Sequence, residues 1–428
     1  MAERRHSSKL ALALGGGGFT GYLFEIGALT ALDDLLDDGV TISDFDLYVG
    51  VSAGAAAAAL VANGVKPEEI LAANLSGARP YYFERRDIFA PAIGEGFKTI
   101  LRIARQLVPL LKLYLRNYRE MSLIDLLDKA QDTFPSGIYT LEPFARHLEA
   151  TFAEKGLSNT FDGLRKELYI PAIDLETGQS VIFGDEGWRQ VPISLAITAS
   201  SAAPLYFCPV RIEGRDYIDA GIGRITFFEM AVEKGADFIV IINPAVHVRH
   251  DMATGGRRGW WRLFWPEPAV HIRHDEAAGG SQLPGDRPVR LRDRGFLSIS
   301  EQASRINLEA RVSQALRLFR QEHPDKEYFV LSPKPTETLL FERSFLSFRD
   351  RVHLLRCGYL SVAEVVTEHF EPIRARFARH GLSISLAKLE ERMKTRMEQF
   401  AGAGAAPSLA PAGHGQPGWS SAKNSFSA

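Results

Sequence analysis

The chain has 428 residues, of which 46% are hydrophobic and 24% charged, and its formal net charge is -2. This length can bury one large hydrophobic core or two smaller ones, and the composition is that of a soluble globular protein. The near-neutral charge argues against a general nucleic-acid binder, which needs a basic excess to neutralise phosphates.

Short apolar segments alternate with helical patterns along most of the chain. Residues 8–14 predict a buried strand, which is followed by four glycines and a helix over 22–36. A second strand over 45–52 precedes a helix of small residues that ends at Asn63 and Gly64. Further strands are predicted at 167–175, 179–185, 215–221, 237–245 and 327–333. The alternation predicts an α/β domain with a mainly parallel central sheet and helices on both faces.

The domain organisation follows from where this alternation stops. We expect one domain over residues 8–340, with a helical cap at about 80–160 and an insertion at about 246–295. Charged helical patterns predict a helical C-terminal extension over 341–400. The tail at 401–428 is rich in Gly, Ala, Pro and Ser and is expected to be disordered.

The number of cysteines and the length of the apolar segments indicate where in the cell the protein is expected. The two cysteines, Cys208 and Cys357, provide no disulfide framework, which suits a reducing environment. The apolar run near the N-terminus is too short for a signal peptide, and no run approaches the roughly 20 residues of a membrane-spanning helix. We therefore expect a cytoplasmic protein that associates peripherally with membranes, although secretion without a leader would fit the same sequence.

Four consecutive glycines, residues 15–18, stand at the first predicted turn from strand to helix, in the run GGGGFTG. Glycines let the backbone approach a ligand closely, and the helix N-terminus adds partial positive charge. Such a loop stabilises an anion, either a bound phosphate or an oxyanion that forms in a reaction. Because the glycines also satisfy the dinucleotide fingerprint, with Asp37 or Asp44 as its acid, a nucleotide-binding protein is one alternative.

The motif GVSAG, residues 50–54, follows a predicted strand and opens a predicted helix. This is the context of a nucleophile elbow, in which a sharp turn lifts the Ser52 hydroxyl out of the sheet. A plain Gly-Ser-Gly turn is the structural alternative. The glycine loop upstream favours the elbow, because an ester hydrolase needs both a nucleophile and donors for the oxyanion.

The pairing of GGGFTG with GVSAG resembles the patatin-like phospholipase family. Three further segments are similar to motifs of that family: IPAIDLETGQSVIFGD at 170–185, ITASSAAPLYFCPV at 197–210 and YIDAGIGR at 217–224. Together the segments cover roughly residues 8–245. Their joint pattern is specific, whereas no single segment is.

The resemblance implies a serine lipid acyl hydrolase with a Ser-Asp dyad. Ser52 would attack the ester carbonyl as the nucleophile, and Asp219 would accept its proton directly. Amides of Gly16, Gly17 and Gly18 would form the oxyanion hole. The implied substrate is a phospholipid or lysophospholipid, and such a dyad requires no cofactor and no metal.

Two positions depart from the family's pattern. Thr20 stands in the glycine motif where many members carry Arg, which indicates a different brace for the loop. Ala220 follows Asp219 where the family usually has Gly, which changes the expected local backbone but keeps the carboxylate.

Two other functions also fit the residues. The order Ser, Asp, His permits an α/β-hydrolase triad of Ser52, Asp219 and His247. A catalytically silent lipid-binding protein of the same fold is the other alternative, against which the intact Ser52 and Asp219 argue.

An internal repeat surrounds that histidine. AVHVRHDMATGG at 245–256 recurs as AVHIRHDEAAGG at 269–280, which favours a local duplication over a catalytic imidazole. Two His-x-x-His pairs in the repeat are weak candidates for a metal site, namely His247/His250 and His271/His274.

Two segments are candidates for membrane contact. Residues 96–119 predict a basic amphipathic helix whose cations share one face, and a cap helix over the active site is the alternative. The cations on this face include Lys98, Arg102, Arg105 and Arg116. Residues 257–265 combine Arg with tryptophans, which favours the depth of lipid headgroups, and packing on the protein's own surface is the alternative. These tryptophans are Trp260, Trp261 and Trp265.

Overall fold

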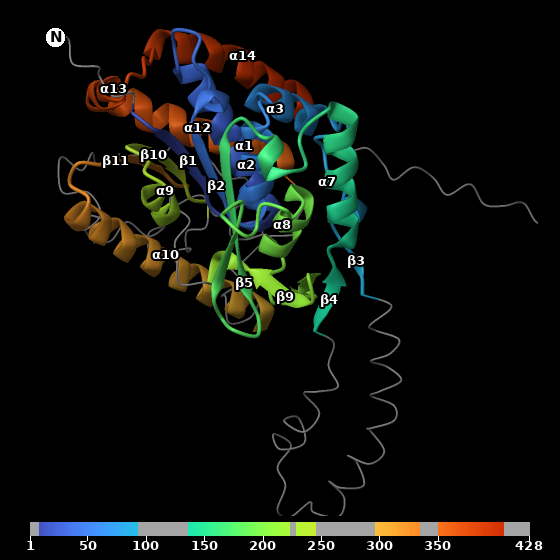
Figure 1. Ribbon diagram of the computed structural model, residues 1–428. Helices are drawn as coiled ribbons and strands as arrows, with labels where there is room; N and C mark the ends of the chain where they lie inside the picture. The colour runs from blue at the N-terminus through green and yellow to red at the C-terminus, as the bar shows by residue number, and fades with distance from the viewer. Residues whose placement is uncertain (1–7, 93–135, 223–227, 245–295, 334–349, 406–428) are drawn as a thin grey trace, which may run out of the picture.

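The computed structural model describes residues 8–92, 136–222, 228–244, 296–333 and 350–405. Within them, eight strands form one sheet in the order β11-β10-β1-β2-β5-β9-β8, with β6 paired to β5. Helices cover both faces of this sheet (Figure 1). The protein therefore has the α/β fold that the alternating sequence segments predict.

The main sheet is parallel over most of its width. Its strands are Leu10–Leu14 (β1), Leu47–Gly50 (β2), Glu167–Asp174 (β5), Ser180–Phe183 (β6), Val210–Ile212 (β8), Arg215–Asp219 (β9), Phe238–Ile242 (β10) and Glu327–Leu331 (β11). Neighbours from β11 to β5 are parallel, with Leu12 of β1 level with Val240 of β10 and Tyr48 of β2. Strands β6, β9 and β8 pair antiparallel with their neighbours. A small second sheet contains Ala90–Pro91 (β3), Gly137–Thr140 (β4) and Leu205–Phe207 (β7).

In the N-terminal part of the chain, strands and helices alternate as the sequence predicts, with α1 after β1 and α2 after β2. The α-helices are Gly18–Leu35 (α1), Ala53–Ala62 (α2), Pro67–Ser76 (α3), Arg85–Ile88 (α4), Glu142–Lys155 (α7), Ile193–Ser200 (α8), Glu229–Glu233 (α9), Phe296–Glu322 (α10), Arg351–Glu368 (α12), Phe370–Arg379 (α13) and Leu386–Ala405 (α14). Short 3-10 turns lie at Ile42–Asp44 (η1), Phe161–Gly163 (η3) and Ala220–Ile222 (η4).

The core lies on both faces of the central strands, because alternate residues of a strand point to opposite sides. In β1, Leu12 and Leu14 pack into the cluster formed with α1, α2 and α12. Ala11 and Ala13 of the same strand pack on the other face, which α9 and α10 cover (Figure 1). Burial on both faces explains why these strands are continuous apolar runs rather than alternating ones.

The C-terminal helices pack directly on the first helix. A Cβ atom at Gly27 of α1 would lie 2.0 Å from the Leu355 carbonyl oxygen, and one at Gly358 of α12 would lie 2.0 Å from that of Phe24. Glycine at both crossing points therefore lets α1 and α12 touch backbone to backbone. These helices share one hydrophobic cluster with α1.

A buried ion pair joins the same parts of the chain. Arg396 of α14 donates to both carboxylate oxygens of Asp34 in α1, at 3.0 and 3.1 Å. Tyr359 of α12 also donates to Asp34, at 3.0 Å. Phe400 is buried, with its ring centroid 6.2 Å from that of Tyr359. Helix α14 continues to Ala405, beyond residue 400, where the sequence predicts its end.

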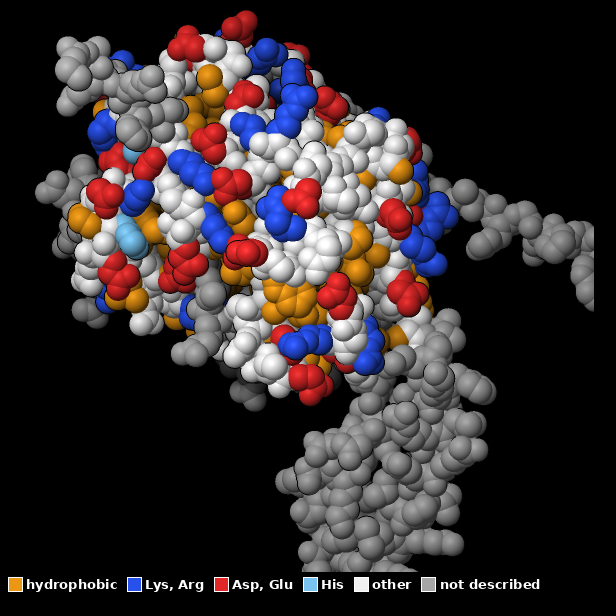
Figure 2. Space-filling view, viewed as in Figure 1, with side chains coloured by type: hydrophobic (Ala, Val, Ile, Leu, Met, Phe, Trp, Pro, Cys, Tyr) orange, Lys and Arg blue, Asp and Glu red, His pale blue; other side chains and the backbone are white. Residues whose placement is uncertain are grey.

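The surface on the face drawn in Figure 2 is mixed in character. Acidic and basic side chains are interspersed there, and hydrophobic side chains form only small groups. None of the described helices combines the length and hydropathy that a membrane crossing requires.

Candidate active site

Ser52 occupies a strained turn between β2 and α2. Its backbone has φ 54° and ψ -124°, a region that residues with a side chain rarely adopt. Close packing holds the turn, because a Cβ atom at Gly50 would lie 2.5 Å from Cα of Ala55 and one at Gly54 would lie 2.3 Å from the Gly15 carbonyl oxygen. The flanking glycines thus allow the geometry of a nucleophile elbow, as the GVSAG motif predicts.

The glycine loop between β1 and α1 passes beside this serine. A Cβ atom at Gly16 would lie 3.1 Å from Cβ and 3.7 Å from Oγ of Ser52. Gly17 and Gly18 have positive φ angles of 148° and 63°, and α1 begins at Gly18. A helix N-terminus and glycine backbone therefore lie next to the Ser52 hydroxyl, where they could stabilise negative charge.

Thr20 braces this loop from within. Its hydroxyl donates a hydrogen bond of 3.2 Å to the Gly17 carbonyl oxygen, and the Gly21 amide donates to the same oxygen at 3.0 Å. The Thr20 side chain is buried. Thr20 thus ties the first turn of α1 to the loop.

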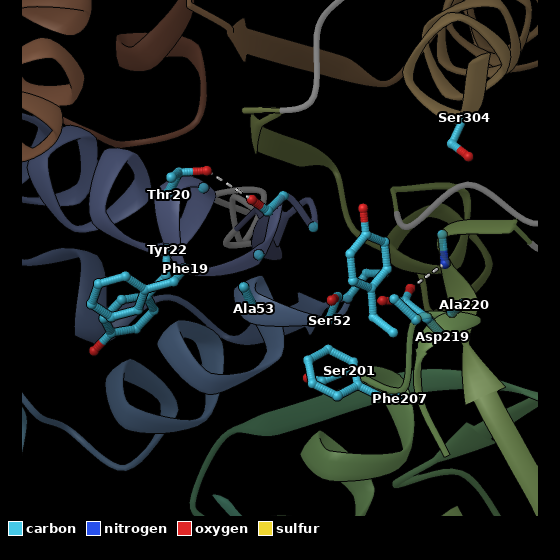
Figure 3. Close-up of a pocket in the computed structure, with 18 of the residues that line it drawn as sticks. Phe19, Thr20, Tyr22, Ser52, Ala53, Ser201, Phe207, Asp219, Ala220 and Ser304 are labelled. Atoms are coloured by element: carbon cyan, nitrogen blue, oxygen red, sulfur yellow. Dashed lines mark hydrogen bonds between the residues drawn. The ribbon is translucent and has the colours of Figure 1, made fainter. Parts of the chain in front are cut away.

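Asp219 ends β9 and lies beside Ser52 (Figure 3). Its Oδ1 atom accepts a hydrogen bond of 2.7 Å from the Gly221 amide, and its own amide donates to the Ala202 carbonyl oxygen at 3.0 Å. Burial raises the pKa of Asp219 to about 6, although hydrogen bonds from the Gly221 amide and the Ser52 side chain oppose the shift. The carboxylate is therefore a stronger base than an exposed aspartate and still ionises near neutral pH.

The backbone after Asp219 accommodates Ala220 without losing the turn. The Ala220 methyl packs into the cluster beneath the sheet, next to α9 and α10. A Cβ atom at Gly221 would lie 3.0 Å from Asp219 Oδ1, so the close contact requires glycine there. Arg311 of α10 donates a hydrogen bond to the Gly221 carbonyl oxygen and holds the turn from outside.

Ser200 supports the elbow, and its role could not be assigned from the sequence. Its fully buried hydroxyl accepts a hydrogen bond of 2.9 Å from the Ser52 amide. The segment ITASSAAPLYFCPV contains two adjacent serines, and nothing in their spacing distinguishes Ser200 from Ser201. The contact arises because the end of α8 meets the start of α2 in the folded protein.

Ser52 and Asp219 open into a cavity of about 320 Å³. One end is enclosed by aromatic and aliphatic side chains, namely Phe19, Tyr22, Phe83, Ile88, Leu141 and Phe144. The rings pack edge to face, with the Phe83 centroid 5.4 Å from that of Tyr22 and 5.7 Å from that of Phe144. Phe83 is only 3% exposed, so this end of the cavity is closed.

The other end of the cavity is open and more polar. Ser304 of α10, which is exposed, lies at this end, and Arg305 follows it in the helix. Figure 3 shows Ser52 between the Phe19 and Tyr22 rings on one side and Ser304 on the other. The cavity thus runs from a solvent-exposed mouth, past Ser52, to a closed apolar end.

Several predicted residues lie outside the described part of the chain. They are the histidines His247, His250, His271 and His274, the basic residues Lys98, Arg102, Arg105 and Arg116, and the tryptophans Trp260, Trp261 and Trp265. Of the residues that the structure does describe around the cavity, none is a histidine. The described residues also contain no group of three His, Cys, Asp or Glu side chains suited to a metal ion.

An elbow serine, a neighbouring buried carboxylate and a glycine loop on an α/β sheet together define the class of serine hydrolases. The family model of the patatin-like phospholipases matches residues 12–232, just over half of the chain. The chain belongs to this family, as the sequence motifs indicate.

Known proteins that are similar to this chain include a phospholipase and a protein of known crystal structure. A cGAMP-activated phospholipase from Escherichia coli (strain TW11681) is 31% identical over an alignment of 113 residues, and the match covers 22% of this chain and 31% of that protein. The chain therefore matches about a third of that relative's length. The crystal structure of VipD from Legionella pneumophila has 14% sequence identity and a TM-score of 0.33, with 85% of this chain and 67% of that chain covered.

Proposed function

We propose that this protein is a lipid acyl hydrolase that cleaves carboxylic ester bonds with Ser52 as nucleophile and Asp219 as base. The observation that carries the proposal is the strained Ser52 turn beside a buried carboxylate and a glycine loop, at the side of an apolar cavity. Family membership supports the same class of reaction.

The first half of the reaction would acylate the serine. Ser52 Oγ attacks the ester carbonyl while its proton passes to Asp219, and the carbonyl oxygen becomes an oxyanion. Amides of Gly16, Gly17 and Gly18 would donate to this oxyanion, and the position of Gly16 beside Ser52 supports this role for the glycine loop. Asp219 then returns the proton to the leaving alcohol, and the acyl group remains on Ser52.

The second half would release the fatty acid. A water molecule attacks the acyl carbonyl, and Asp219 accepts a proton from the water and returns it to Ser52 Oγ. A carboxylate whose pKa is about 6 suits both directions of transfer, since it is ionised near neutral pH and yet binds a proton more readily than a free aspartate.

The shape of the cavity supports a lipid substrate. At its closed end the cavity is lined by apolar side chains that could contact an acyl chain, and its open end has room for the alcohol part of the ester. A phospholipid or lysophospholipid would place its glycerol and headgroup at the mouth. We also propose that the protein associates peripherally with membranes through residues 96–119 and 257–265.

Labelling with a fluorophosphonate probe tests the nucleophile. The wild-type protein should be labelled and Ser52→Ala should not, because the probe reacts with an activated serine hydroxyl. Ser76→Ala is the matched control, since the Ser76 hydroxyl lies on α3 and bonds to the Ala72 carbonyl oxygen. Labelling that persists in Ser52→Ala would overturn the assignment.

Lipid analysis of a membrane extract then tests the reaction class. Incubation with the wild-type protein should release free fatty acids from phospholipids, and incubation with Ser52→Ala should not. A wild-type protein that is not labelled and releases no fatty acid would favour the alternative of a catalytically silent lipid-binding protein.

A further inference from the structure

One face of α10 lines the open end of the cavity. The residues on this face are Ser300, Ser304, Arg305, Leu308 and Arg311. Ser300, Ser304, Leu308 and Arg311 are spaced by three or four residues, so they form one stripe along the helix, and Arg305 stands at its side. Ser304 of this stripe lies across Ser52 from the Phe19 and Tyr22 rings (Figure 3).

The stripe gives the mouth a local positive charge. Among the described residues around the cavity, Arg305 and Arg311 are the cations and Asp219 is the carboxylate. Arg311 donates a hydrogen bond to the Gly221 carbonyl oxygen and so supports the turn after Asp219. Arg305 is half-buried, lines the cavity and follows the exposed Ser304 in the helix.

We infer that this stripe is a subsite for the phosphate of a lipid headgroup, with Arg305 as its specificity-determining residue. The inference rests on the proposed function, which places the scissile ester at Ser52 and the acyl chain in the closed end. Arginine binds phosphate oxygens through paired N–H donors, and the Ser300 and Ser304 hydroxyls add further donors. A neutral acylglycerol carries no anion for this subsite, so phosphate-bearing lipids should be preferred.

A matched pair of substrates measures this preference. A short-chain diacyl phospholipid below its aggregation concentration is compared with the diacylglycerol that has the same two chains. Arg305→Gln should lower the ratio of the two kcat/KM values about tenfold, as expected for one charge-assisted hydrogen bond in a partly exposed site. Arg317→Gln should keep the wild-type ratio, because Arg317 lies on the same helix, is exposed and does not line the cavity.

The outcomes separate the subsite from other roles of Arg305. An equal loss on both substrates would show that Arg305 supports the cavity rather than the phosphate, and an unchanged ratio would show no contact. A loss seen only with anionic vesicles would assign Arg305 to attraction by the membrane surface. A response of diacylglycerol turnover to inorganic phosphate that disappears in Arg305→Gln would assign the site to free phosphate.

These results are distinguishable from failure of the proposed function. If the wild-type protein hydrolyses neither soluble lipid and is not labelled by fluorophosphonate, the proposed function fails. If it is labelled and hydrolyses both lipids with a ratio that Arg305 does not affect, only the phosphate subsite is wrong.

Discussion

The Ser200 hydroxyl accepts a hydrogen bond of 2.9 Å from the backbone amide of Ser52, and both residues are buried. This contact fixes the amide of a residue whose backbone is held at a positive φ angle. Ser200 belongs to α8, so the elbow depends on a helix that is distant from it in sequence.

Ser200→Ala should slow the reaction without removing the nucleophile. The substitution leaves the Ser52 amide buried and unpaired, which costs about 1–3 kcal/mol and loosens the turn. We expect kcat on a soluble ester to fall roughly tenfold with little change in KM, because each 1.4 kcal/mol in the barrier is a factor of ten. Ser200→Thr should restore most of the rate, since it returns the hydroxyl. An equal loss in Ser200→Thr would indicate a packing role instead.

Asp219→Asn should abolish turnover and preserve the fold. The amide keeps the size of the carboxylate but cannot accept the Ser52 proton, so activity should fall by several orders of magnitude, as measured on a soluble ester beside circular dichroism. His247→Ala should leave activity largely intact. If the histidine variant is the inactive one, the reaction depends on a triad and the dyad is wrong.

The pH dependence of the reaction should reflect the buried carboxylate. Asp219 acts as a base only when ionised, and its pKa is about 6, so kcat/KM should rise with pH through about 6 and then level off. The same shift should make the carboxylate lower the free energy of unfolding as pH rises between about 4 and 6, since the unfolded chain loses this proton first. An inflection of kcat/KM near 4 would show that the carboxylate is solvated.

Phe83→Ala should change the preferred length of the acyl chain. Phe83 closes the apolar end of the cavity against Tyr22 and Phe144, so its removal extends the space for an acyl chain. Rates on p-nitrophenyl esters of increasing length should shift their maximum toward longer chains. Phe152→Ala is the control, because Phe152 of α7 is fully buried and does not line the cavity. Each of the two truncations should lower the free energy of unfolding by about 3–5 kcal/mol. The same profile in both variants would place the end of the acyl site elsewhere.

Charge reversal and tryptophan removal should separate two modes of membrane binding. Replacing Lys98, Arg102, Arg105 and Arg116 by Glu should weaken co-sedimentation with anionic vesicles, by about 1 kcal/mol per cation at most and mainly at low salt. Replacing Trp260, Trp261 and Trp265 by Ala should weaken it in a way that salt does not mimic. Both variants should retain turnover of a soluble ester. Unchanged sedimentation in both would remove these segments from the membrane proposal.

The parts of the fold that local patterns encode were predictable. Runs such as 237–245 and 327–333 predict buried strands, and the structure has β10 and β11 there, shortened at their ends. The sheet is mixed at one edge, because β9 and β8 form an antiparallel pair after β5. The two-residue turn between β8 and β9 is local, since Glu213 and Gly214 both have positive φ angles. The antiparallel position of β9 beside β5 depends on tertiary packing, which apolar alternation alone could not give.

Only those residues of the candidate site that belong to short sequence motifs could be predicted from the sequence. Gly16 and Ser52 belong to short runs whose spacing carries chemical meaning. Ser200, Arg305 and Phe83 reach the site from three separate helices or loops, and each stands in a stretch without a distinctive pattern. Their positions follow from the packing of α8, α10 and the segment that carries Phe83 around the cavity, which no local spacing encodes.

Pairing between distant ends of the chain constrains how this protein can be made. β1 lies between β2 and β10, and α1 needs α12 to cover its glycine face. During synthesis the N-terminal strand and helix therefore leave the ribosome long before their partners exist. Contacts so far apart in sequence slow folding and leave apolar edges open to aggregation. The newly made N-terminal half should consequently depend on chaperones, and a fragment limited to the family-matched residues should be insoluble.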